Sequence, residues 1–97
     1  MTVDGNWNLV VATPLGERHG ILSVQTEGTT LKGQMIDSST AEIFDGTVNG
    51  HEICWKVNIT EPMPMTLEFT GTINGDELAG SVILGGFGTS SFSGTRS

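Results

Sequence analysis

Two histidines, one cysteine and eleven carboxylates are the residues with which this chain could bind a metal or catalyse a reaction. Metal-binding histidines and cysteines usually stand at short spacings such as Cys-x-x-Cys, and His19, His51 and Cys54 show no such spacing. Cys54 alternates with Ile53 and Trp55, so we expect its thiol to point away from the core, and nothing in the sequence places a base beside it. These residues predict no metal site, no cofactor and no nucleophilic cysteine.

One pair of carboxylates, Glu52 and Glu68, falls on the polar face of two neighbouring predicted strands. Paired carboxylates are what glycosidic and proton-transfer chemistry require. Lys56 shares the same face, however, and a solvated outer surface with one ion pair accounts for all three residues.

Glu42 and Arg18 differ from that group because they share the strand phase of Phe44 and Gly20, which we expect to face inward. An inward charge near an open end of the fold can hold the polar end of a ligand, or it can extend back to water. The same two residues are the candidates for a cofactor-free isomerase, cyclase or lyase with its site inside the fold.

Apolar residues on connections and strand ends form the main candidate site. Flexible thioethers and aromatic rings around a concavity suit the binding of a small apolar or amphipathic molecule. Two other interpretations are that these residues fill the core, or that they form a contact between subunits of a homo-oligomer. The apolar candidates are Leu15, Met35, Phe44, Met63, Met65 and Phe87, and Glu42 and Arg18 complete the predicted ligand-binding set.

The elements that must position these residues are β-strands. One phrase recurs five times: an apolar residue, any residue, glycine, any residue, and a fifth position that is apolar in every copy but the last. The first, third and fifth residues of a copy share one face of a strand, and an inward glycine lets a sheet coil closely. The copies are 31–35, 44–48, 69–73, 78–82 and 92–96.

We expect a single domain over residues 1–97, folded as an all-β, eight-stranded antiparallel up-and-down β-barrel, with a split sandwich as the alternative. Tight glycine turns follow the even strands and longer apolar connections follow the odd strands, so we place the ligand at the odd-connection end. The second strand is ambiguous, because either Leu22 or Ile21 could face inward. The expected strands are 5–13, 17–26, 30–37, 41–49, 51–60, 64–74, 76–84 and 88–96.

Composition excludes several partners. The net charge of −7 argues against nucleic acid or an anionic membrane surface. No apolar run approaches the length of a membrane-spanning helix, and the first residues lack a signal pattern. The single cysteine cannot form an internal disulfide, so we expect a cytoplasmic location.

Gly5, Trp7 and Arg96 carry a resemblance to a known superfamily. In an even-stranded barrel the first and last strands are neighbours, so the guanidinium of Arg96 is expected to lie over the indole of Trp7 as a cation–π contact. This arrangement resembles the calycins (lipocalins, fatty-acid-binding proteins and avidins), in which a basic residue of the last strand covers a Gly-x-Trp strand. Lipocalins are longer, with a helix and a lid loop that are missing here, and the aromatic residues that hold biotin in avidins have no counterpart.

The chain is also similar, over nearly its whole length, to a bacterial domain of about a hundred residues that occurs alone or appended to hydrolases such as amidohydrolases. No activity is implied by that resemblance, but it raises the alternative of an interaction or oligomerisation module. The leading hypothesis is a non-catalytic barrel that binds a small apolar or amphipathic molecule. The segments that carry the similarity are 14–16, 31–33, 45–50, 69–72 and 92–96, with Trp7.

Overall fold

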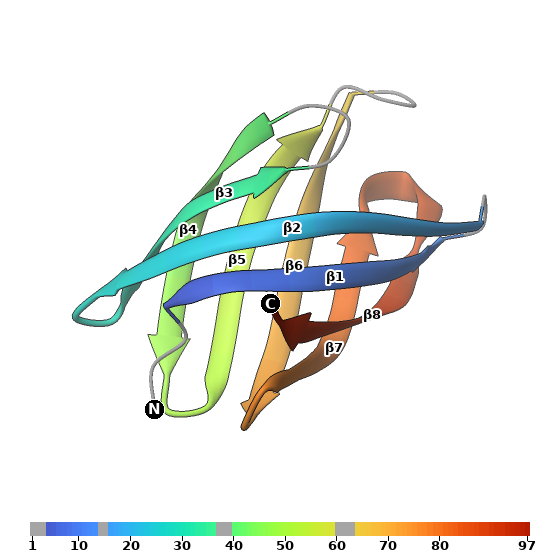
Figure 1. Ribbon diagram of the computed structural model, residues 1–97. Helices are drawn as coiled ribbons and strands as arrows, with labels where there is room; N and C mark the ends of the chain where they lie inside the picture. The colour runs from blue at the N-terminus through green and yellow to red at the C-terminus, as the bar shows by residue number, and fades with distance from the viewer. Residues whose placement is uncertain (1–3, 14–15, 37–39, 60–63) are drawn as a thin grey trace.

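The computed structural model describes residues 4–13, 16–36, 40–59 and 64–97. Eight strands follow one another along the chain and form a closed barrel in which each strand pairs antiparallel with its neighbours and β8 pairs with β1 (Figure 1). The strands are β1 Gly5–Thr13, β2 Gly16–Glu27, β3 Thr30–Ile36, β4 Thr40–Asn49, β5 Glu52–Ile59, β6 Met65–Asn74, β7 Glu77–Leu84 and β8 Thr89–Arg96, with a short 3-10 helix, η1 (Gly85–Phe87), before β8.

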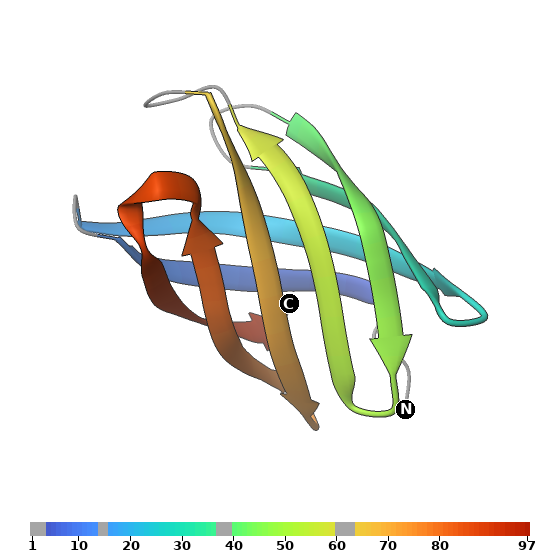
Figure 2. The same cartoon turned by 180° about the vertical axis from the view of Figure 1, so that it is seen from behind.

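The predicted up-and-down β-barrel is therefore confirmed, and closure of the sheet rules out the split sandwich. Every predicted strand begins and ends within one residue of the observed one. The strands on opposite sides of the barrel cross: β1 and β2 pass in front of β5 and β6 in Figure 1, and Figure 2 shows the same crossing from behind. Within the described ranges no helix is long and apolar enough to cross a membrane.

The two ends of the chain close the barrel as expected from Trp7 and Arg96. The two residues are paired in the β1–β8 register, and the Arg96 guanidinium carbon lies 4.3 Å from the centroid of the fully buried Trp7 ring. Arg96 Nη1 donates a hydrogen bond to the Asp4 backbone carbonyl (3.0 Å), and Nε donates to Asp76 Oδ1 (3.2 Å). The cation–π contact and the two hydrogen bonds of this guanidinium together stabilise the pairing of the first and last strands.

Three aromatic rings fill the centre of the barrel. Trp55 stacks on Phe69 with ring centroids 4.7 Å apart, and Phe92 meets both rings edge-on at 5.7 and 5.1 Å. The indole Nε1 of Trp55 donates to the sulfur of Met35 at 3.5 Å, so its polar atom is satisfied inside an apolar core. Buried aliphatic side chains from β1 to β7 surround the rings, and the interior is packed with the protein's own residues.

Inward glycines allow this close packing, as the repeated phrase predicted. A Cβ added at Gly80 would collide with the backbone carbonyl of Thr70 on β6. A Cβ added at Gly71 would lie 2.9 Å from both Leu78 Cδ1 and Phe92 Cζ. Glycine at these positions is what lets neighbouring strands and rings approach one another.

The second copy of the phrase is the exception, and the prediction for it was wrong. Asp45 and Gly46 of β4 both lie opposite Trp55 of β5, which is a β-bulge, and Asp45 has a positive φ of 52°. The extra residue shifts the phase of the strand, so Gly46 is buried as expected but Phe44 is 37% exposed. Ile43 takes the inward position instead, with 7% of its surface exposed.

The same bulge corrects the predicted orientation of Glu42. Glu42 does share a strand face with Phe44, but that face is the outer one, and the Glu42 side chain is exposed. In β2 the ambiguity is resolved in favour of Leu22, which is fully buried, whereas Ile21 is 40% exposed on the outer face.

Candidate functional site

The predicted ligand site at the odd-connection end is only partly described. Leu15 and Met63 lie outside the described residues, and so does the side chain of Phe87. Met35 at the end of β3 and Met65 at the start of β6 are half-buried and pack against the core at this end. Because Met35 also accepts the hydrogen bond from Trp55, part of its surface belongs to the core rather than to a free binding surface.

Arg18 shows the expected strand phase, because it pairs with the buried Val11 and alternates in step with Leu22. Its side chain is nevertheless exposed, since β2 extends beyond the packed part of the barrel at this end. Arg18 and Glu42 are therefore separated, the first on the inner face of β2 and the second on the outer face of β4. The structure does not bring the two charges together inside the barrel.

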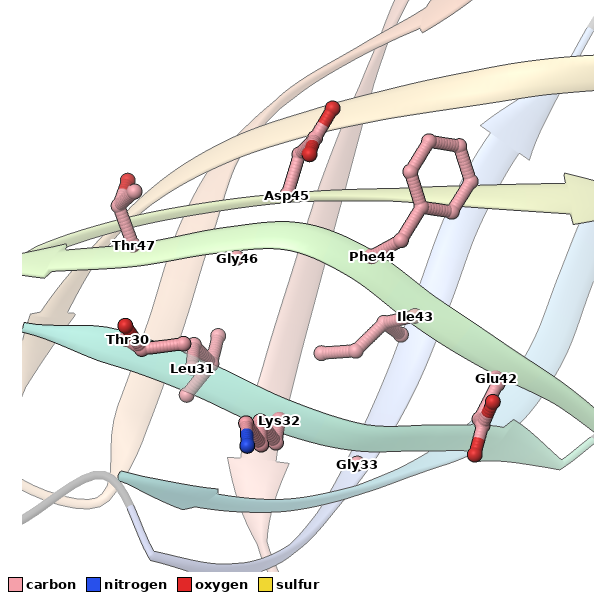
Figure 3. Close-up of a pocket in the computed structure, with 10 residues that line it drawn as sticks. All are labelled: Thr30, Leu31, Lys32, Gly33, Glu42, Ile43, Phe44, Asp45, Gly46 and Thr47. Carbon is pink, nitrogen blue, oxygen red and sulfur yellow. The ribbon is translucent and has the colours of Figure 1, made fainter. Parts of the chain in front are cut away.

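A groove in the barrel wall contains the other two predicted residues, Glu42 and Phe44. It has a volume of about 580 Å³ and is lined by residues 30–33 of β3 and 42–47 of β4. Figure 3 shows Leu31 and Ile43 in the space between the two strands, with the Phe44 ring on the far side of β4 and the Glu42 side chain over the end of β3. The floor of the groove is thus apolar, and charged side chains stand along its rim.

The groove forms where the ladder between β3 and β4 is interrupted. Leu31 pairs with Gly46 and Gln34 pairs with Glu42, so residues 43–45 of β4 stand opposite only residues 32–33 of β3. The unequal lengths prevent regular pairing, and the two strands part between those pairs. A single inserted residue at Asp45 therefore both turns Phe44 outward and opens the wall beside it.

The lysines around the groove already have anionic partners. Lys32 Nζ lies 2.8 Å from Glu27 Oε2, and Lys56 Nζ lies 3.7 Å from both Asp45 Oδ2 and Glu68 Oε1. The hydrogen bond and charge of Lys32 lower the pKa of Glu27, and Glu27 raises the pKa of Lys32 in return. The Lys56–Glu68 pair is the ion pair predicted for that outer face.

Glu42 is the one rim carboxylate that makes no hydrogen bond or ion pair with any described residue. It is exposed at the end of the groove that lies nearer the odd connections. A ligand in the groove would meet an apolar floor and this carboxylate, and the exposed Phe44 ring lies across β4 from that floor.

Residues of catalytic or metal-binding type are scattered. Among the described residues no three histidine, cysteine, aspartate or glutamate side chains come together in a way that could hold a metal ion. His19 and His51 are exposed, and Cys54 is half-buried on the outer side of β5, as its alternation with Trp55 predicted.

The alternation of residues in the sequence did not predict the groove. The signal for it was the dipeptide Asp45-Gly46 in the middle of a predicted strand, because aspartate followed by glycine favours positive φ and is typical of turns and bulges. Reading that pair as a bulge would have turned Phe44 outward and placed Ile43 in the core.

The fold and the groove define a small, closed β-barrel with an amphipathic depression in its wall. Comparisons with family models, with curated proteins and with solved structures find no match to the chain.

Proposed function

We propose that this protein is a non-catalytic binding barrel for a small amphipathic molecule, and that the molecule occupies the groove between β3 and β4. The observation that carries the proposal is the groove itself, with about 580 Å³ of space, an apolar floor of Leu31 and Ile43, and a charged rim. Small-molecule sites are typically concavities of ~300–1,000 Å³ with mostly apolar walls and a few polar groups.

The packed interior supports a site on the wall. Trp55, Phe69 and Phe92 occupy the centre of the barrel, and an eight-stranded barrel has room there for its own side chains or for one small ligand. The odd-connection end stays the alternative location, represented in the described residues by Met35, Met65 and Arg18.

One of the two residues on which the enzyme alternative depends does not face the interior of the barrel. A cofactor-free isomerase, cyclase or lyase acting inside the barrel was to use Glu42 or Arg18, and Glu42 faces solvent. Chemistry of that kind would then have to depend on Arg18 as its charged group.

A calycin relationship is also a proposal. It is supported by the closed eight-stranded barrel and by the guanidinium of Arg96 over the ring of Trp7. A role as an interaction module for hydrolases rests on the sequence resemblance, and Ile21, Phe44 and Ile83 are exposed apolar side chains, on β2, β4 and β7, that such a module could use.

The proposed site is tested with a neutral hydrophobic dye, Nile red, whose fluorescence rises in apolar surroundings. Phe44→Ser removes the exposed ring of the groove and should weaken dye binding about fivefold, which corresponds to roughly 1 kcal/mol of lost apolar contact. Ile83→Ser is the matched control, because Ile83 is 44% exposed on the outer face of β7, away from the groove.

Three outcomes separate the locations. Loss of binding in Phe44→Ser, with Ile83→Ser and Met65→Asp unchanged, supports the groove. Loss only in Met65→Asp moves the site to the odd-connection end and contradicts the groove. A dimer that Phe44→Ser dissociates, without dye binding, identifies the groove as a subunit contact and overturns the proposal.

A further inference from the structure

We infer that the ligand of the groove is an organic cation, an ammonium or guanidinium group attached to an apolar body. The inference rests on the proposed function of the groove and adds the charge of its ligand. Two features support a cationic ligand: the distribution of charges along the rim and the position of Glu42 relative to the apolar surface.

Glu42 stands at one end of the groove as an anion without a partner among the described residues. Phe44 occupies the same outer face of β4 two residues farther along, and Ile43 lies between them at the floor. A molecule with its apolar part against the floor of the groove, Leu31 and Ile43, would therefore bring its polar end to the Glu42 carboxylate. Opposite charge at that end is the favourable choice.

The lysines do not reverse this preference. Lys32 is the basic residue of the groove lining, and its ammonium group is hydrogen-bonded to Glu27. Lys56, beside Phe44 in the β4–β5 register, lies between Asp45 and Glu68. An anionic ligand would have to compete with carboxylates for both lysines and would face Glu42 directly.

The electrostatic field of the whole protein also favours a cationic ligand. The groove lining carries two carboxylates, Glu42 and Asp45, against one lysine, Lys32, whose ammonium group is paired with Glu27. The whole chain carries a net charge of −7. Such a surface attracts cations over distances of about a Debye length, ~8–10 Å at moderate salt.

The experiment compares three amphiphiles that share a decyl chain and differ in their head groups: decyltrimethylammonium, decyl sulfate and decyl glucoside. Binding is measured by titration calorimetry, with each compound below its micelle-forming concentration. We expect the cation to bind about threefold to fivefold more tightly than the neutral compound, the range for one exposed ion contact, and the anion to bind most weakly.

Glu42→Gln should remove the preference for the cation and leave binding of decyl glucoside unchanged. Glu77→Gln is the matched control, because it removes the same charge from an exposed position at the start of β7. Raising the salt concentration should reduce the preference in the wild-type protein and have little effect on the Glu42→Gln protein.

The outcomes distinguish the inference from the function on which it rests. Equal binding of the three compounds, or tighter binding of the anion, overturns the cation inference while the binding function stands. A preference for the cation that persists in Glu42→Gln also overturns it. Failure of all three compounds to bind contradicts the proposed function itself.

Discussion

The wall formed by β5, β6, β7 and β8 differs from the wall formed by β3 and β4. In the first, each residue has a partner in an unbroken antiparallel register, and more buried positions alternate with more exposed ones along every strand. In the second, one inserted residue interrupts the register and leaves a groove. The regular wall supplies the central rings of the core, and the interrupted wall presents an aromatic side chain to solvent.

Under the proposed function, this difference lets a small barrel combine a packed interior with a binding surface. Ninety-seven residues leave little interior volume beyond what the side chains themselves fill. An interruption in the wall creates a concavity outside the core, so the three central rings need not be displaced to admit a ligand. The proposal thus assigns stability and binding to different strands.

The largest expected effect comes from truncating the same residue type in the two walls. Phe69→Ala removes a ring that is 1% exposed and stacked on Trp55, and it should lower the free energy of unfolding by about 3–5 kcal/mol. Phe44→Ala removes a ring that is partly in solvent and should change it by less than about 1 kcal/mol. Urea unfolding of the two variants measures both values, and similar losses would contradict the division between the walls.

A smaller effect is expected from overfilling the regular wall. Gly71→Val places a branched side chain against Leu78 and Phe92 and should cost about 1–3 kcal/mol. Thr72→Val is the control, since it places the same valine side chain on the outer face of the same strand. Equal stability of the two variants in urea would mean that the inner side of β6 has free space.

The sequence predicted the regular wall almost completely and the interrupted wall only in part. Alternation along 53–59 and 65–73 placed Trp55 and Phe69 inside, because every side chain in an unbroken strand follows a period of two. The same rule failed at Asp45, because one extra residue there reverses which side chains of the preceding part of β4 face inward. Glu42 and Phe44 were therefore assigned to the wrong face. The groove depends on a pairing between two strands, and that information is absent from the alternation within either one.

The pairing of β1 with β8, which closes the barrel, can be compared with the interrupted wall in the same way. Arg96→Ala removes the cation–π contact with Trp7 and should cost about 0.5–2 kcal/mol. Lys32→Ala, beside the interrupted wall, removes an ion pair between two exposed side chains and should lower stability less, because solvent screens such pairs. Thermal unfolding of both proteins tests the order, and a greater loss in Lys32→Ala would contradict it.

The smallest effect concerns the pH dependence of the Glu27–Lys32 pair. The lowered pKa of Glu27 means that its contribution is present above the pKa of the unfolded chain and is lost as the pH falls through the folded-state pKa. The raised pKa of Lys32 means that its contribution is lost as the pH rises through the folded-state pKa. In an NMR titration, Lys32→Met should return the pKa of Glu27 toward its ordinary value, and an unchanged titration would show that Lys32 does not cause the shift.

The most direct test of the central claim is an NMR titration of the isotope-labelled protein with decyltrimethylammonium. If the interrupted wall is the binding site, the backbone amides of Leu31 and of residues 43–45 shift in a saturable manner, while those of Arg18 and Met65 stay in place. Saturable shifts confined to Arg18 and Met65, with the groove amides unmoved, would contradict the account and place the ligand at the odd-connection end.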